Sequence, residues 1–396
     1  MTHHFFQDVD RSIETDVLVV GAGLVGLSAA IAFAKQGKRV VLVDAKSAMK
    51  QKTQAWDARI YALSPESETW LKSLGIWQYV DPERVCPIEA MHVWHREEEL
   101  VLSSSDACLP KLGVIIENQN LMFALWQKIK ALDVTIVTEV NCVKLENTLQ
   151  AVTLSLDNNQ QISTKLLLAA DGAHSWVRQQ ANIGIQHKDF LQTAIVANFS
   201  TEKSHRNVAR QWFAPHETLA LLPLVGQNVS LVWSVSAEKA SELLKLSSQD
   251  LAVQVQMQSQ DMLGGLKPIG KTLSFALHSQ IAMQFIAARL ALVGDAAHQI
   301  HPMAGQGVNL GFRDVMELTS LATKIHPMQD LGDAAFLRQY ARARRADTLA
   351  MNRLTSALDA LFASDSKMLK QLTSWGLRQL NRKSSVKKLL IQQAAA

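Results

Sequence analysis

The chain has 396 residues, of which 48% are hydrophobic and 19% charged, and its formal net charge at pH 7 is +4. This composition is that of an ordinary globular protein, long enough for two domains and neither disordered nor fibrous. So small a net charge on a chain of this length argues against nucleic-acid binding as the main activity.

The cysteines and histidines predict a protein of a reducing compartment that holds no metal. Cys86, Cys108 and Cys142 are far apart and odd in number, so they form neither a disulfide framework nor a metal-ligand spacing. The histidines form no His-Glu-x-x-His motif and no Cys/His cluster. The apolar stretch 16–34 follows acidic residues and contains glycines, which suits a folded turn better than a signal peptide or membrane span. We therefore expect a cytoplasmic protein.

A dinucleotide-binding pattern lies near the N-terminus. Residues 15–20 predict a strand buried on both faces of a parallel sheet. Residues 21–26 read Gly-Ala-Gly-Leu-Val-Gly, a G-x-G-x-x-G that opens a helix, and a second strand at 39–43 ends at Asp44. This motif indicates dinucleotide binding when a strand precedes it, a helix follows it, and a second strand ends in an acidic residue, and all of these are present here.

Each residue of the pattern has a physical role. Gly21 makes the tight turn, and Gly23 lets a pyrophosphate approach the backbone. Gly26 lets helix and strand pack closely, while Asp44 accepts a hydrogen bond from an adenosine ribose hydroxyl. A tight crossover without a ligand is the alternative.

Two further polar positions lie between the first motif and the middle of the chain. Arg59 lies among apolar residues, so its guanidinium either reaches a buried anion or a backbone turn, or forms a core salt bridge. Asn118 lies in a polar cluster at the start of an amphipathic helix at 121–131.

Two buried strands are each followed by an acidic residue next to a glycine. Asp171-Gly172 follows an apolar run at 166–170, and Gly294-Asp295 follows another at 290–293. Each pair alone is a common turn. Together they place two carboxylates in the crevice beyond the ends of sheet strands, where a ligand binds.

A glycine-rich stretch follows the second acidic tip and leads into an apolar helix. Glycines this dense let the backbone pass close to a flat ligand, and the first turn of the helix can present N–H groups to an electron-rich ring edge. The alternative is a glycine-rich turn before a core helix. The residues expected at such a ligand are Pro302, Gly305, Gln306, Gly307, Val308 and Asn309.

The middle third predicts an antiparallel sheet with helices on one face, inserted between two parts of the nucleotide-binding domain. Its strands are expected at 193–199, 219–224, 229–235 and 272–281, and its helices at 237–246 and 249–257. The apolar residues of this sheet either form a plain core or wall a pocket for a hydrophobic ring. They are Trp212, Phe213, Leu222, Pro223 and Trp233.

The C-terminal part predicts a long helix at 333–362 and a basic tail. From Asp365 to the end of the chain there are seven Lys or Arg and one Asp, with apolar residues at helical spacing. A basic amphipathic helix suits an anionic membrane surface, or else packs its apolar side on the domain, and the two are compatible.

Taken in order, these motifs resemble the single-component FAD-dependent aromatic monooxygenases of the p-hydroxybenzoate hydroxylase fold. The resemblance is closer to the ubiquinone-biosynthesis hydroxylase family and extends from about residue 15 to 385. The closer likeness rests on residues 57–64, 116–118, 221–224, 231–233 and above all 294–314.

The resemblance implies an α/β fold, with a Rossmann-like FAD-binding domain, an inserted α+β substrate domain built on an antiparallel sheet, and a C-terminal helical tail. The implied segments are 15–80, 111–182 and 281–330 for the FAD-binding domain, 81–110 and 183–280 for the substrate domain, and 331–396 for the C-terminal helices and basic tail.

The resemblance also assigns roles to residues. Those assigned to FAD are Gly21, Gly23, Gly26, Asp44, Arg59, Asn118, Asp171, Gly172, Gly294, Asp295, Gly305, Gln306, Gly307, Val308 and Asn309. Within this set, Asp295 would bind the ribityl chain, Asn118 the ribityl or phosphate portion, and 305–309 the isoalloxazine ring. Asp171-Gly172 would serve both FAD and NADPH. Arg59, Pro302 and Gly305 are the implied catalytic residues, and no phenol-activating tyrosine is assigned.

The implied reaction is hydroxylation of a polyprenylated phenol or benzoquinol in ubiquinone biosynthesis. NAD(P)H reduces FAD, and the reduced flavin takes up O₂ as a C4a-hydroperoxide whose distal oxygen passes to the ring. Implied partners are the prenylated substrate, O₂, other ubiquinone-biosynthesis proteins and the inner face of the membrane. The alternatives are a hydroxylase or halogenase of a soluble aromatic compound, and a non-catalytic FAD-binding scaffold. The halogenase signature of a lysine after the first motif and a Trp-rich segment is not seen in the sequence.

Overall fold

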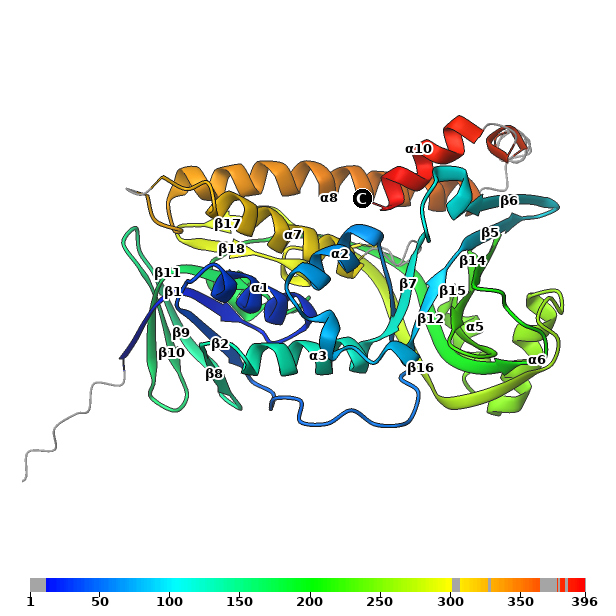
Figure 1. Ribbon diagram of the computed structural model, residues 1–396, viewed down its shortest axis with the longest axis horizontal. Coiled ribbons are helices and arrows are strands. Elements are labelled where there is room, and N and C mark those ends of the chain that lie inside the picture. The colour runs from blue at the N-terminus through cyan, green and yellow to red at the C-terminus, as the bar shows by residue number, and fades with distance from the viewer. Residues whose placement is uncertain are drawn as a thin grey trace, which may run out of the picture.

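The computed structural model describes residues 12–300, 307–326, 329–363, 376, 378–381 and 384–395. Two eight-stranded sheets and one three-stranded sheet form its framework, with helices packed around them (Figure 1). The α/β fold class is confirmed.

The first sheet carries the parallel strands that the motifs predict. The strands β18, β11, β1, β2 and β8 lie side by side in that order and run parallel. Their bounds are β1 Ser12–Val20, β2 Val40–Asp44, β8 Val134–Thr138, β11 Gln161–Ala169 and β18 Leu290–Leu292. Short antiparallel strands extend the sheet, namely β9 Cys142–Asn147, β10 Val152–Leu156 and β17 Ile286–Ala287. Because parallel strands end at one edge, the residues after β1, β2, β11 and β18 meet there.

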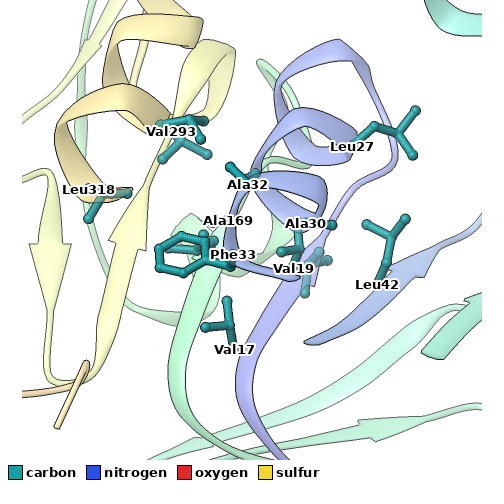
Figure 2. Close-up of a cluster of buried hydrophobic side chains, with 14 of the residues drawn as sticks. Val17, Val19, Leu27, Ala30, Ala32, Phe33, Leu42, Ala169, Val293 and Leu318 are labelled. Atoms are coloured by element: carbon teal, nitrogen blue, oxygen red, sulfur yellow. The ribbon is translucent and has the colours of Figure 1, made fainter. Parts of the chain in front are cut away.

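Helix α1 (Leu24–Lys35) covers this sheet because its side chains are apolar and mostly small. Leu27, Ala30 and Phe33 are fully buried. Figure 2 shows Ala30 beside Val19 of β1, Leu27 on the side of Leu42 of β2, and Phe33 beside Ala169 of β11. Helices α3 (Asn118–Lys130) and α7 (Gly307–Ala322) pack on either side of α1, and α8 (Ala334–Ala363) packs on α7.

The second sheet is the predicted antiparallel one, extended at both ends. Its order is β19-β16-β12-β15-β14-β13-β5-β6. The bounds are β5 Ala90–His95, β6 Glu98–Ser103, β12 Ile185–Thr201, β13 Val208–Ala214, β14 Glu217–Leu224, β15 Asn228–Ser236, β16 Leu266–Ala282 and β19 His298–Gln299. Helices α5 (Ala237–Leu243) and α6 (Ser248–Gln258) cover one face.

Two features of this sheet differ from expectation. The strands expected for this sheet do not include β5 and β6, but β5 pairs in parallel with β13 and forms a hairpin with β6. Strand β13 was not predicted as a strand. The division into domain segments stays a prediction, although strand pairing groups β5 and β6 with residues 185–282.

The aromatic residues of the sheet lie mostly away from the other domain. Trp212, Trp233, Leu219 and Leu231 belong to the core beneath α5 and α6. Side chains alternate between the faces of a strand, so their neighbours Gln211, Val232 and others face the opposite side. Of the five residues proposed to wall a pocket, Leu222 alone lines the cavity described below.

Smaller elements join the two sheets and complete the chain. The third sheet has the order β3-β7-β4, formed by β3 Ile60–Leu63, β7 Gly113–Glu117 and β4 Val85–Ile88. Helices α2 (Pro65–Ser73) and α4 (Trp176–Gln180) and the short helices η3 (Ser104–Ala107) and η4 (Gly294–Ala296) follow strands, and α10 (Ser384–Ala395) is the last element. Across the described segments, no helix combines the length and apolar character needed to span a membrane.

Candidate FAD and substrate site

One large cavity, of about 1160 Å³, lies between the carboxyl edge of the parallel sheet and one face of the second sheet. Most of the predicted site residues line it: Gly21, Gly23, Asp44, Arg59, Asn118, Asp171, Gly172, Asp295, Gly307 and Val308. Ligand pockets usually measure roughly 300–1,000 Å³, so this cavity has room for a cofactor and a substrate ring together. Gly26, Gly294 and Asn309 lie behind its wall, and Pro302, Gly305 and Gln306 lie outside the described residues.

The loop before α1 has an open side toward the cavity. Gly21 has φ +105°, a conformation that suits glycine, and a Cβ on Gly26 would lie 1.9 Å from the Gly21 carbonyl oxygen. A Cβ on Gly23 would meet no atom within 4 Å. Gly23 is also the N-cap of α1, and no side chain caps that helix. The free N–H groups of the first turn therefore form a cradle that fits an anionic pyrophosphate.

Asp44 closes the other side of this cradle. Its carboxylate accepts hydrogen bonds from the backbone N–H of Ala22 at 2.5 Å and of Lys46 at 2.6 Å. These bonds fix the carboxylate at the tip of β2, where it lines the cavity. An acidic group held there can accept from ribose hydroxyls.

The two predicted acidic tips follow neighbouring parallel strands, β11 and β18. Asp171 accepts from the Ser175 hydroxyl at 2.5 Å and from the Val177 N–H at 3.0 Å, which attaches it to the start of α4. Burial raises the pKa of Asp171, although these hydrogen bonds oppose the increase. Arg178 connects the segment after β11 to the segment after β18, because its guanidinium donates to the carbonyl oxygens of Ala173 and Ala296.

Asp295 is open to the cavity yet surrounded by protein on the other sides. Burial therefore raises the pKa of its carboxyl group, while His298, Arg59 and His278 act in the opposite direction. A carboxylate at this edge of the sheet can accept hydrogen bonds from the hydroxyl groups of a ligand in the cavity.

Asp57, next to the predicted site, connects Arg59 to helix α3. Its carboxylate accepts from the Arg59 N–H at 2.9 Å and from the Gln119 N–H at 3.1 Å. The Asn118 N–H donates to the Arg59 carbonyl oxygen at 2.9 Å. Two residues that are far apart in sequence, Arg59 and Asn118, are thus held together at the cavity wall.

The Arg59 side chain points into the cavity rather than into the core. Its guanidinium lies 5.3 Å from the ring centroid of Phe275, a cation–π contact. No ion pair joins it to any residue in the described ranges, so the core salt bridge considered from the sequence is not what forms there.

Asn309 has a structural position that the glycine-rich motif did not predict. Its side chain donates to the Ala62 carbonyl oxygen at 2.9 Å and accepts from the Ser64 N–H at 3.0 Å. It therefore ties the start of α7 to β3 and to the N-cap of α2. Asn309 therefore does not line the cavity. Among the described residues of the motif, Gly307 and Val308 do.

Sequence reasoning missed several residues of the cavity wall. Tyr61 lines it, and burial raises the pKa of its phenol to about 12, against the effect of Arg59, so the group stays protonated near neutral pH. Gln211, Thr218 and Ser234 supply polar groups from the second sheet. The alternation of polar and apolar residues along β13–β15 was the signal that could have found them.

The described segments contain no cluster of three or more His, Cys, Asp or Glu side chains suited to a metal ion. The cradle, the acidic tips and the size of the cavity instead fit a dinucleotide such as FAD.

Comparison with known proteins gives concordant results. The model of a family described as the FAD binding domain matches residues 14–355. Ubiquinone hydroxylase UbiL of Rhodospirillum rubrum is 33% identical over 382 residues, which cover 96% of this chain and 89% of that protein. The 3-demethoxyubiquinol 3-hydroxylase of Escherichia coli is 32% identical, over 96% of this chain and 98% of that protein. The mouse ubiquinone biosynthesis monooxygenase COQ6 is 31% identical, over 96% of this chain and 90% of that protein.

Solved structures share the fold at lower identity. The p-nitrophenol 4-monooxygenase PnpA of Pseudomonas putida has a TM-score of 0.77 at 17% identity, over 96% of this chain and 97% of that one. HpxO of Klebsiella pneumoniae, in complex with FAD and uric acid, has a TM-score of 0.74 at 17% identity, over 95% and 96%. At this identity the likeness shows the fold.

Proposed function

Because this chain belongs to the FAD-dependent hydroxylase family of ubiquinone biosynthesis, we propose that it hydroxylates the aromatic ring of a polyprenylated phenol or benzoquinol. The reaction consumes NAD(P)H and O₂. The observation that supports this substrate class best is the continuity of the cavity, which runs from the α1 cradle to an uncharged face of the second sheet.

FAD, when bound, supplies the redox chemistry and the activation of O₂. The residues of this chain bind and orient it: the first turn of α1 for the pyrophosphate, Asp44 for the adenosine ribose and Asp295 for the ribityl chain. We propose the same role for the start of α7, whose Gly307 and Val308 bring backbone N–H groups to the cavity wall. Such N–H groups stabilise negative charge that develops on a flavin ring.

The substrate half of the cavity holds a ring between polar and apolar groups. Gln211, Thr218 and Ser234 offer hydrogen bonds to ring oxygens. Tyr61, which stays protonated, offers a phenolic O–H, and Arg59 beside it supplies a fixed positive charge. Enclosure of the ring keeps water from the reacting atoms.

Anaerobic reduction of the bound flavin by NADPH tests the proposal. We expect one prenylated phenol to accelerate the reduction strongly, and O₂ then to give a hydroxylated product. Flavin that binds but is not reduced with any phenol would contradict the proposal and favour a non-catalytic FAD-binding protein. Acceleration by soluble aromatic acids alone would favour the alternative substrate class.

We also propose that the protein acts on the inner face of a membrane, with α10 as one contact. Lys388 and Leu389 of α10 are exposed, Leu389 to 57%. A basic residue beside an exposed apolar one suits an anionic lipid surface. Association with other ubiquinone-biosynthesis proteins stays a prediction.

Sedimentation with lipid vesicles checks the membrane contact. We expect the protein to sediment with vesicles that contain anionic phospholipid, and the double variant Lys388→Glu, Leu389→Asp to sediment less. Val143→Asp is the matched control, since Val143 is exposed to 56% on β9. Equal sedimentation of wild type and double variant would rule out α10 as the contact.

A further inference from the structure

The end of the cavity beside the β5–β6 hairpin has an apolar wall built by side chains to which the proposed mechanism gives no role. Six apolar side chains form it: Ile88, Met91, Leu102, Leu112, Leu222 and Ile391. They come from β4, the β5–β6 hairpin, the residue before β7, β14 and the C-terminal helix α10. The hydrogen-bonding groups of the second sheet, by contrast, lie on β13, β14 and β15. This half of the cavity is therefore divided into a polar part and an apolar part.

Helix α10 reaches into the apolar part. Ile391 is only 4% exposed and lines the cavity, and Lys387, one turn earlier on the same side, is also buried. The Lys387 Nζ lies 3.9 Å from an Asp106 carboxylate oxygen of η3, which follows β6 directly. Figure 1 shows α10 beside this part of the chain, close to β6. The last helix of the chain thus covers the hairpin side of the cavity.

The residues just before α10 fix this position. The side chain of Asn381 forms two hydrogen bonds with the backbone of β6. It donates to the Glu99 carbonyl oxygen at 3.3 Å and accepts from the Val101 N–H at 3.5 Å. Leu380 packs on Val93 and Leu100 of the hairpin. An edge strand leaves backbone groups unpaired, and the side chain of Asn381 satisfies two of them.

We infer that the isoprenoid tail of the substrate lies in this apolar part, between the β5–β6 hairpin and α10, in contact with Met91, Leu102 and Ile391. This inference rests on the proposed function. The polar groups on β13–β15 hold the oxygens of the ring, while a hydrocarbon chain gains by leaving water for a wall of methyl and methylene groups. Ile391 then helps to determine which tail length is accepted, although it lies far from the dinucleotide motifs in the sequence.

The variant Ile391→Trp narrows this part of the cavity and tests the inference. Two substrates with the same ring are compared, one with a single isoprene unit and one with several. We expect KM for the long-tailed substrate to rise by about tenfold or more, because apolar pockets discriminate by roughly that factor for small changes in size. KM for the short-tailed substrate, its kcat and the rate of flavin reduction by NADPH should stay unchanged. Gln392→Trp, on the exposed side of the same helix, is the matched control and should change neither KM.

Ile391→Ala provides a second measurement if the tryptophan does not fit. It removes tail contacts without adding volume, so KM should again rise for the long-tailed substrate alone. Equal effects on both substrates, or none on either in both variants, would overturn the inference. Failure of the proposed function is distinguishable, because the wild-type holoenzyme would then hydroxylate neither prenylated substrate.

Discussion

Gly23 and Gly26 are three residues apart, at the N-cap and in the first turn of α1, but their surroundings differ. A Cβ on Gly23 would point into open space at the cavity, and φ of −75° is ordinary for any residue. A Cβ on Gly26 would collide with the Gly21 carbonyl oxygen. The absence of a Cβ on Gly23 therefore leaves room for a ligand, and the absence of a Cβ on Gly26 lets α1 pack closely against the Gly21 backbone.

We predict that Gly23→Ala weakens FAD binding without harming the FAD-free protein. Loss of one hydrogen bond to a charged group costs about 1.5–3 kcal/mol, so the FAD dissociation constant should rise roughly tenfold or more. The unfolding free energy of the apoprotein should change by less than about 1 kcal/mol. Gly26→Ala is the control, and its steric clash should destabilise even the apoprotein by about 1–3 kcal/mol. Flavin fluorescence titration and urea unfolding measure the two quantities, and unchanged FAD affinity in Gly23→Ala would argue against the cradle.

At the scale of elements, Asn309 connects three of them. It lies in the first turn of α7, and its side chain bonds backbone groups at the end of β3 and at the N-cap of α2. Asn309 is fully buried, so no water can replace these bonds. The glycine-rich motif thus includes a residue whose side chain fixes the motif against β3, which carries Tyr61 and directly follows Arg59.

Asn309→Ala should therefore destabilise the protein by about 2–4 kcal/mol, since it leaves a buried N–H and a buried carbonyl without their partner. Urea unfolding of the apoprotein measures this change separately from any loss of FAD. Asn147→Ala, at an exposed position of β9, should stay within about 0.5 kcal/mol of wild type. Similar stability of the two variants would show that the Asn309 bonds contribute little.

At the scale of the whole molecule, a buried charge cluster joins the long helix α8 to the dinucleotide-binding half. Asp314 of α7 is 0% exposed and accepts from the Gly294 N–H at 2.8 Å, from His298 Nε2 at 2.8 Å and from Arg344 Nε at 2.7 Å. Burial acts to raise its pKa, but His298 and Arg344 outweigh it and hold the pKa below the ordinary value of 3.8. Arg344 comes from α8, so the long helix is fixed to the loop that carries Asp295.

Asp314→Asn should destabilise the fold by about 1.5–3 kcal/mol at pH 7, because the buried Arg344 loses one of its two charged partners and keeps the ion pair with Asp347 at 2.7 Å. A carboxylate whose pKa is lower in the folded state stabilises above its unfolded pKa, and the stabilisation is lost as pH falls through the folded pKa. The difference in unfolding free energy between wild type and Asp314→Asn should therefore be constant from about pH 8 to 5 and shrink below about pH 4. Urea unfolding at stepped pH checks this, and a difference that does not depend on pH would assign the effect to packing alone.

The sequence by itself determined the α/β class, the family and the FAD-dependent hydroxylase activity, and all three are confirmed. It could do so because local chemistry carries these features. A G-x-G-x-x-G after a buried strand and an acidic residue at a strand tip have few other uses. For the same reason it placed Asp44, Asp171 and Asp295, which do lie together along one cavity.

Only the tertiary structure decided which residues meet across the cavity. Because side chains alternate between the faces of a strand, Leu222 faces the cavity and Trp212 faces the core. A shift of the strand register by one residue would reverse these faces, and no short sequence motif fixes the register. The contact of Ile391 with the cavity depends on a helix that returns from the far end of the chain. Pairings between segments so distant in sequence arise from the packing of whole elements, because no local pattern of residues specifies them.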